Sequence, residues 1–283
     1  MTRTWFITGA NRGLGRAFTE AALAHGDHVV GTARDPQTLR DLTQDRLTVL
    51  PLDVRDRENV HATVRQAFTV TGALDVIVNN AGYGLVGAAE EFTETQIRDQ
   101  MDTNFYGAVW VTQAALPRLR EQGHGHIVQI STVGAVGSMP LFSMYNAGKW
   151  ALEGYSGALA DELRPFGIAV TIAQLGGFAT DWAGSSMKFA NANPAYDELR
   201  SAVLGTANYP DPQAVPVAAD EQPDPEWVDA DPAVAAAAVL RLVDMTDPPL
   251  RTIIGPGAHQ MVAMALDQRR RDYETDPEFT WPA

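Results

Sequence analysis

Short apolar runs alternate with amphipathic segments along most of this chain. Seven runs are each long enough to form a buried strand. They cover Trp5–Ile7, His28–Thr32, Leu47–Leu52, Leu74–Val78, His126–Ile130, Ala169–Ala173 and Thr252–Ile254. Helical patterns separate most of them, at Arg16–Ala24, Val60–Thr71, Thr95–Arg120 and Ala147–Arg164. This alternation predicts an α/β fold with a doubly wound, seven-stranded parallel sheet and helices on both faces. Ligands are expected at the carboxyl ends of the strands.

One segment departs from the alternation. Residues Asn208 to Pro232 contain six prolines and seven acidic residues but no lysine or arginine. Prolines interrupt regular structure and acidic side chains resist burial, so this segment is expected to be an extended loop. It is either a solvated excursion or a lid that folds Trp227 or Tyr209 over a substrate. We expect one domain over residues 1–283, with a substrate-loop region at about 181–232.

Composition narrows the possible partners. The 283-residue chain has a net charge of −14, which argues against nucleic acid or an anionic membrane as a partner. It contains no cysteine, so disulfides and thiol catalysis are excluded. No apolar run approaches the ~20 residues of a membrane span. The first strand begins too early for a signal peptide, and a cytoplasmic protein is expected.

A glycine-rich turn follows the first predicted strand. Thr8–Gly15 reads Thr-Gly-Ala-Asn-Arg-Gly-Leu-Gly and leads directly into a helical pattern. Glycine allows a tight turn and close approach of the backbone to a ligand. The N–H groups and dipole at the start of the helix then attract a pyrophosphate. A purely structural turn is the alternative, but strand, turn and helix together favour a nucleotide site.

Tyr145 and Lys149 lie four residues apart in a predicted helix, and therefore on one face of it. An ammonium group beside a phenol favours the phenolate, so the two side chains can act as a proton donor and acceptor. Alone, this spacing is more typical of an ordinary surface contact than of a catalytic pair. Its significance comes from the glycine turn upstream.

The glycine spacing and the later Tyr-x-x-x-Lys resemble the short-chain dehydrogenase/reductase family, in its single-domain form. The resemblance runs from about Thr4 to about Thr180 and resumes near Pro249. Further motifs occur in the family's order: Asn79-Asn80-Ala81-Gly82, Asn104, Ile127–Thr132 and Gly176–Thr180. The resemblance implies a Rossmann-like fold that binds a nicotinamide cofactor.

It also implies which residues would bind that cofactor. They are Gly9, Asn11, Arg12, Gly13, Leu14 and Gly15 in the glycine turn, Arg34, Asp53 and Val54 near the adenosine, Asn80, Ala81 and Gly82 after the fourth strand, and Tyr145, Lys149 and Thr180 near the nicotinamide.

The end of the second strand indicates which cofactor is used. Members of the family that prefer NAD place an acidic residue there for the ribose 2′-hydroxyl. Here that position is Ala33, and Arg34 follows it. Arg34 and Arg12 could clamp a 2′-phosphate by charge-assisted hydrogen bonds, which predicts NADP(H). Asp35 is the competing group, since a shifted strand end would bring its carboxylate to the ribose.

The resemblance assigns catalytic roles as well. Tyr145 would exchange a proton with the substrate oxygen. Lys149 and the positively charged nicotinamide would lower the pKa of this phenol, and Lys149 would also bind the nicotinamide ribose. Asn104 would sustain a water link from Lys149 to solvent, and Thr180 would bind the carboxamide. The family's serine, thirteen residues before the tyrosine, is replaced here by Thr132.

Two positions depart from the family pattern, one at the end of a strand and one in a loop. Ser131 lies one residue too early for the serine position, and adjacent strand residues point to opposite faces. Thr132 is therefore the preferred catalytic hydroxyl, with Ser131 as the alternative. The family's Pro-Gly after the sixth strand is replaced by Leu175-Gly176, which leaves that loop less restrained.

The function expected is NADP(H)-dependent interconversion of a ketone and a secondary alcohol. Bulky residues after Thr180, namely Trp182, Met187 and Phe189, suggest a partly apolar carbonyl substrate. The alternatives are epimerisation or reductive cyclisation at the same site, and a non-catalytic NADP(H)-sensing protein. Family members often form homodimers or homotetramers, here through Thr95–Arg120 and Ala147–Arg164.

Overall fold

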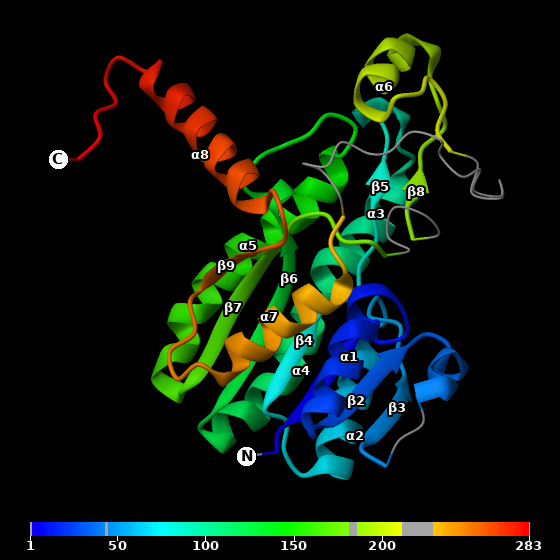
Figure 1. The fold of residues 1–283 in the computed structure, drawn as a ribbon, viewed down its shortest axis with the longest axis vertical. Coiled ribbons are helices and arrows are strands. Elements are labelled where there is room, and N and C mark those ends of the chain that lie inside the picture. Colours follow the sequence, from blue (N-terminus) through cyan, green and yellow to red (C-terminus); the bar gives the residue numbers. More distant parts are fainter. Residues whose placement is uncertain (1, 43–44, 181–185, 211–228, 283) are drawn as a thin grey trace.

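A seven-stranded parallel sheet forms the centre of the molecule (Figure 1). The computed structural model describes residues 2–42, 45–180, 186–210 and 229–282. The strand order is β3-β2-β1-β4-β6-β7-β9, so the chain winds outward from β1 in both directions, as predicted. The strands are β1 (Thr4–Thr8), β2 (His28–Ala33), β3 (Leu47–Pro51), β4 (Val76–Asn79), β6 (Gly125–Thr132), β7 (Ile168–Leu175) and β9 (Arg251–Ile254).

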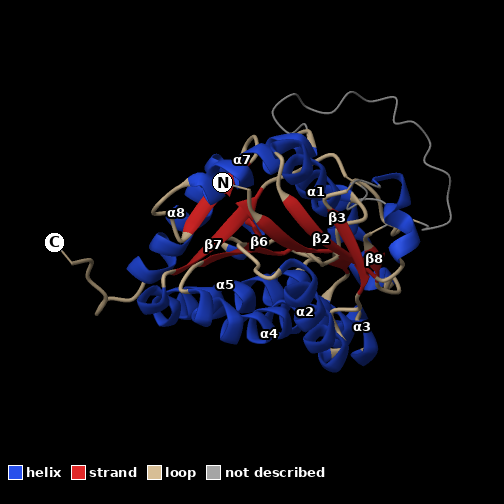
Figure 2. Ribbon diagram, turned by 90° about the horizontal axis from the view of Figure 1, so that it is seen from below, coloured by secondary structure: helices blue, strands red, loops and turns tan. Residues whose placement is uncertain are grey.

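Helices cover both faces of this sheet (Figure 2). One face carries α1 (Gly13–His25) and α7 (Pro232–Asp244). The other carries α2 (Arg57–Thr71), α4 (Gly107–Gln122) and α5 (Ser143–Leu163). Because both faces are covered, consecutive strand residues are buried rather than alternating with exposed ones. In β1, for example, Trp5, Phe6 and Ile7 are all at most 1% exposed.

The long helix predicted over Thr95–Arg120 is interrupted. It consists of α3 (Glu94–Met101), a π-helical turn η3 (Asp102–Tyr106) and then α4. A π turn accommodates an extra residue, and such turns are frequent at functional sites. Asn104 lies at the centre of this turn, so the departure falls on a predicted site residue.

A smaller substructure stands beyond the carboxyl ends of the sheet (Figure 1). It contains β5 (Leu85–Val86), which pairs in parallel with β8 (Lys188–Phe189), and the short helix α6 (Asp197–Leu204). The sequence did not predict these elements. The last helix, α8 (Ala258–Glu274), extends away from the sheet.

The structure tests only part of the proline-rich segment. Residues 211–228, with Trp227, lie outside the described residues, as do 181–185 with Trp182. Ala230 forms a parallel bridge with Phe178, and Pro232 begins α7. Across the described ranges, no helix is long and apolar enough to cross a membrane.

Candidate active site

The glycine turn is locked onto the segment that follows β4. Asn80 donates from Nδ2 to the carbonyl oxygens of Thr8 (2.9 Å) and Gly9 (3.2 Å). In return, the Thr8 hydroxyl accepts from the backbone N–H groups of Asn80 and Ala81, at 3.0 Å each. A Cβ on Gly15 would lie 2.1 Å from the Gly9 carbonyl oxygen, so this contact requires glycine. The predicted Gly9–Gly15 and Asn80–Gly82 segments thus form one unit.

The start of α1 suits an anionic ligand. Arg12, the residue before the helix, is extended and gives no side-chain cap. The first-turn N–H groups, which include those of Gly13 and Leu14, are therefore the type of donor that binds a pyrophosphate. Gly13 also lies close to Thr180, since a Cβ on Gly13 would lie 3.4 Å from the Thr180 Cβ. These features fit a dinucleotide.

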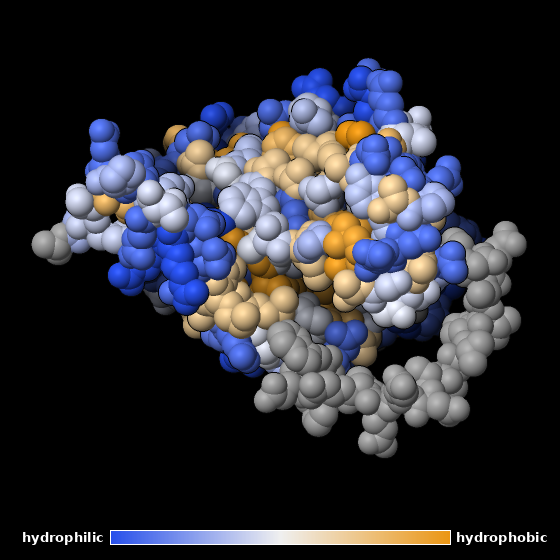
Figure 3. Space-filling model, turned by 90° about the horizontal axis from the view of Figure 1, so that it is seen from above, coloured by the Kyte–Doolittle hydropathy of each residue, from blue (hydrophilic) through white to orange (hydrophobic). Residues whose placement is uncertain are grey.

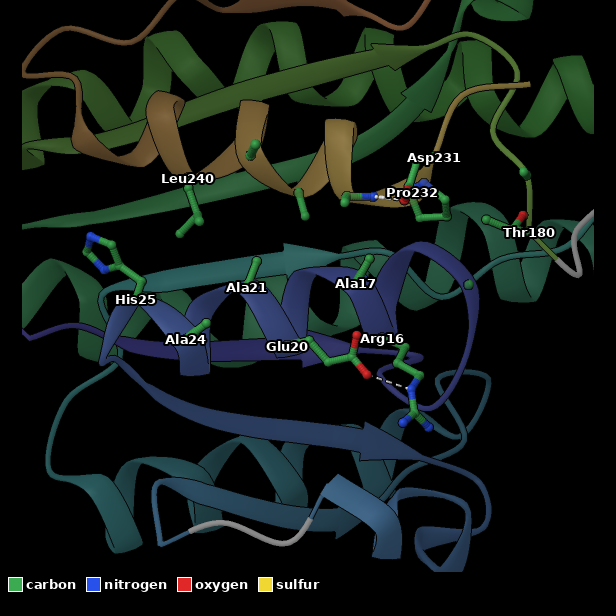
Figure 4. Close-up of a pocket in the computed structure, with 15 residues that line it drawn as sticks. Arg16, Ala17, Glu20, Ala21, Ala24, His25, Thr180, Asp231, Pro232 and Leu240 are labelled. Atoms are coloured by element: carbon green, nitrogen blue, oxygen red, sulfur yellow. Dashed lines mark hydrogen bonds and ion pairs between the residues drawn. The ribbon is translucent and has the colours of Figure 1, made fainter. Parts of the chain in front are cut away.

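A groove between α1 and α7 opens at the same end of α1 (Figure 4). It encloses about 1020 Å³ and is lined largely by alanines of the two helices. Thr180 and Asp231 lie at one end, and His25 and Leu240 lie at the other. Of the residues predicted to bind the cofactor, only Gly13 and Thr180 line this groove.

Thr132, Tyr145 and Lys149 converge at the end of β6. Lys149 donates from Nζ to the carbonyl oxygen of Ile130 at 2.7 Å. Thr132 shares a hydrogen bond with the Tyr145 phenol. Tyr145 and Lys149 are 8% and 6% exposed, respectively. The helix α5 and the strand β6 therefore bring together the three groups that the sequence singled out.

Ser131 is not part of this group. Its hydroxyl donates at 2.8 Å to Glu153, which lies one turn beyond Lys149 on α5. Glu153 also accepts from Gln174 and Arg251, so Ser131 belongs to a buried structural network. Thr132, and not Ser131, therefore contacts the Tyr145 phenol.

The pKa of Tyr145 differs from the expectation. Lys149 was expected to lower it, but burial raises it to about 12, opposed by the hydrogen bond with Thr132. Burial also lowers the pKa of Lys149 to about 8. Desolvation disfavours the charged form of both groups. At neutral pH the phenol is therefore protonated, which is the form that donates a proton.

Asn104 connects the cofactor side of the site with the catalytic helix. Its side chain donates to the Tyr83 carbonyl oxygen (2.9 Å) and accepts from the Tyr83 N–H (3.0 Å). A Cβ on Gly82 would lie 3.2 Å from its Oδ1, and one on Gly148 would lie 3.6 Å from its Cβ. The Asn80–Gly82 segment, the π turn and α5 are thus packed in series.

The residues predicted to lie near the adenosine differ from one another in their contacts. Arg12 and Arg34 are exposed, and neither forms an ion pair within the described ranges. Asp35 instead accepts from the Gln37 N–H at 3.0 Å, in the turn after β2. Asp53 pairs with Arg55 at 2.7 Å, and hydrogen bonds from Arg55 lower its pKa.

Val54 is buried, and a Cβ on Gly107 would lie 2.7 Å from its Cγ2. Its packing against the start of α4 is therefore structural, in addition to the adenine contact that the sequence predicts. The remaining predicted cofactor residue, Asn11, is partly exposed in the glycine turn.

Tyr145 belongs to an apolar cluster of buried side chains. Figure 3 shows apolar side chains gathered in the hollowed centre of the face above the sheet. The buried members are Val86, Ala88, Leu141, Phe142 and Tyr145. Met187 and Phe189, predicted to shape the pocket, pack against them. Trp182 lies outside the described residues. The contributions of Val86, Leu141 and Phe142 were missed, because they come from short segments without a recognisable pattern.

Comparison with known proteins identifies the family. A model described as short chain dehydrogenase matches residues 3–190. Oxidoreductase BOA17 of Botryotinia fuckeliana is 36% identical over 94% of this chain and 94% of its own length. The 3-ketodihydrosphingosine reductase of Bacteroides thetaiotaomicron is 34% identical over 88% of this chain and 87% of its own length.

Solved structures of similar proteins support the same family assignment. A short-chain dehydrogenase from Streptomyces avermitilis has a TM-score of 0.84 at 37% identity, with 97% of both chains covered. Among less similar folds, a short-chain dehydrogenase from Burkholderia cenocepacia was solved with NADP, and one from Burkholderia phymatum with NAD. This chain therefore belongs to the short-chain dehydrogenase family and is an oxidoreductase.

Proposed function

We propose that this protein interconverts a ketone and a secondary alcohol by hydride transfer, with NADP(H) as cofactor and Tyr145 as the general acid and base. The observation that supports this most is the convergence of Thr132, Tyr145 and Lys149 at the end of β6. Asn104 and the Asn80–Gly82 segment join this group to the glycine turn through direct packing.

Each side chain then has a role in carbonyl reduction. When bound, NADPH supplies the hydride. The Tyr145 phenol gives its proton to the carbonyl oxygen, and the Thr132 hydroxyl holds that oxygen in place. The Lys149 cation stabilises the phenolate that remains, and Lys149 and Thr180 orient the nicotinamide end. Asn104 keeps the π turn against α5, where a water link returns the proton from solvent.

A panel of carbonyl compounds tests the proposal. We expect NADPH absorbance to fall when purified protein meets at least one ketone of the panel. Isomerisation without net NADPH oxidation would favour epimerisation instead, and reduction coupled to ring closure would favour a reductive cyclase. Tight NADPH binding without turnover on any carbonyl would favour the sensing protein.

A partly apolar substrate is proposed from the cluster around Tyr145. The buried side chains of this cluster are aliphatic or aromatic. One relative is named for a keto compound of the sphingosine type, which is consistent with a substrate that carries apolar carbon.

The choice of NADP(H) depends on Arg34. We expect Arg34→Ala to weaken NADPH binding about tenfold or more and to leave NADH binding nearly unchanged, because hydrogen bonds to a charged group contribute about 1.5–3 kcal/mol. Titration of protein fluorescence with each cofactor measures this. Arg118→Ala, which removes an exposed guanidinium from α4, is the control. An unchanged ratio of the two affinities in Arg34→Ala would show that Arg34 does not read the 2′-phosphate.

Two adjacent substitutions separate the candidate hydroxyls. Thr132→Val keeps the shape of the side chain but removes the hydroxyl, and we expect kcat to fall roughly 10²-fold, as for other single donors to a reacting oxygen. Ser131→Ala removes only a hydrogen bond to Glu153 and should leave kcat within a few fold of the original. Steady-state kinetics with one ketone measures both. The reverse order of effects would assign the role to Ser131.

A further inference from the structure

A buried ion pair lies beside the apolar cluster, outside the group of reacting side chains. Glu91 and Arg200 are 109 residues apart in sequence, and Nη1 of Arg200 lies 2.5 Å from Oε1 of Glu91. Their side chains are 0% and 1% exposed. Charges this deeply buried are tolerated only when their remaining hydrogen-bonding groups are satisfied. Such a pair is therefore expected to join the segments that supply its partners.

The Glu91 carboxylate is fully engaged. It accepts from the backbone N–H groups of Ala88 and Asn193, each at 2.7 Å, and from the Tyr209 hydroxyl. Burial raises the pKa of this carboxyl, but these hydrogen bonds and the charge of Arg200 outweigh it, and the pKa is lowered overall. Glu91 is thus ionised at neutral pH.

The Arg200 guanidinium, which extends from α6, is also hydrogen-bonded at each of its nitrogens. It donates to the carbonyl oxygens of Ala207 (2.6 Å) and Asn193 (2.9 Å) and pairs with Asp197. Its centre lies 5.0 Å from the centroid of the Tyr209 ring, a favourable cation–π distance. We name Glu91, Arg200 and Tyr209 together the clasp.

The clasp holds the segment that forms the outer part of the apolar cluster. Between its anchor points at Asn193 and Tyr209 lie Tyr196, Leu199 and Val203, which pack against the buried side chains around Tyr145. The Phe189 ring also lies 5.6 Å from the Tyr209 ring. The substructure containing β5, β8 and α6 is thereby fixed above the carboxyl ends of the sheet (Figure 1).

We propose that Glu91, Arg200 and Tyr209 are positioning residues that hold this apolar wall against the reaction site and so set a preference for large apolar carbonyl substrates over small ones. The inference rests on the proposed ketone reduction. A wall held in place buries the carbon chain of a long substrate, and each methylene buried in such a pocket changes kcat/KM roughly tenfold or more. A small ketone reaches only the reacting groups and gains little from the wall.

Acetone and methyl nonyl ketone are the two probes. Tyr209→Phe removes one hydrogen bond of the clasp and keeps the ring, and the double variant Glu91→Gln, Arg200→Met removes both charges. We expect the ratio of kcat/KM for the long ketone to that for acetone to fall roughly tenfold in the double variant and less in Tyr209→Phe. The change should appear as a higher KM for the long ketone, with kcat for acetone preserved. Arg200→Lys, which keeps the charge, should retain part of the selectivity.

Controls separate this outcome from general damage. Arg164→Met breaks an exposed ion pair at the C-terminal end of α5 and should leave the ratio unchanged. NADPH affinity and circular dichroism show whether each variant is folded, and Tyr209→Phe keeps the test valid if the double variant does not fold. An unchanged ratio in folded clasp variants would overturn the inference alone. A parent protein that binds NADPH but reduces neither ketone would overturn the proposed function for these substrates, and the inference with it.

Discussion

Replacing Tyr145 with phenylalanine is expected to lower kcat for carbonyl reduction by a factor of about 10²–10⁴, the usual contribution of a positioned general acid. The variant keeps the ring that packs against Phe142 and loses only the hydroxyl that meets Thr132. NADPH affinity should change much less than turnover, because the glycine turn and the start of α1 are untouched. Single-turnover oxidation of NADPH measures the loss.

Tyr155→Phe is the matched control on the same helix. Burial raises the pKa of Tyr155 to about 12 as well, and its phenol hydrogen-bonds to a threonine, Thr112. Both substitutions remove one buried hydrogen bond and should cost about 0.5–1.5 kcal/mol of stability. Only the change at Tyr145 should lower kcat by the large factor given above. Equal rates for Tyr145→Phe and Tyr155→Phe would refute the assignment of Tyr145 as the proton donor.

The pH dependence of reduction should reflect the raised pKa of Tyr145. A phenol with a pKa of about 12 remains protonated through neutral and mildly alkaline pH, so proton supply does not limit reduction there. Alcohol oxidation needs the phenolate and is disfavoured by the same burial. Within the chain, the hydrogen bond with Thr132 opposes this rise in the pKa of Tyr145.

Hydrophobic patterning was sufficient to predict the sheet. All seven apolar runs became strands of one parallel sheet, because a strand buried on both faces is a continuous apolar run. The pairing of Tyr145 with Lys149 was predictable too, since helix geometry alone places residues four apart on one face. These are local rules, and they do not depend on which segments meet in space.

Features that depend on tertiary contact were not predictable. The partnership of Glu91 with Arg200 spans 109 residues, and both lie in short elements that the sequence did not predict. The π turn at Asn104 is set by packing against Tyr83 and Gly148, so the local pattern indicated an unbroken helix. The effect of burial on the pKa of Tyr145 could not be predicted for a related reason. Spacing shows the neighbouring charge, but not how completely the site is desolvated.

Gly15→Ala is expected to disrupt the cofactor site more than any other single-methyl change in the glycine turn. The new Cβ would lie 2.1 Å from the Gly9 carbonyl oxygen and 2.5 Å from Asn80 Nδ2. Removing these clashes would require a backbone shift that breaks the hydrogen bonds joining Asn80 to Thr8 and Gly9. We expect a loss of about 1–3 kcal/mol or more in stability, as for other overpacked sites. NADPH affinity should fall steeply, because the first turn of α1 would move.

Calorimetric titration with NADPH and thermal unfolding measure the two effects, and Gly154→Ala provides the same chemical change in a permissive place. A Cβ on Gly154 would meet nothing within 4 Å, and the residue lies in the middle of α5. Alanine there should be neutral or stabilising by up to about 1 kcal/mol, because it favours the helix. NADPH binding by Gly15→Ala at the affinity of the parent protein would show that the turn can open without loss, and that the backbone contact between Gly9 and Gly15 does not shape the cofactor site.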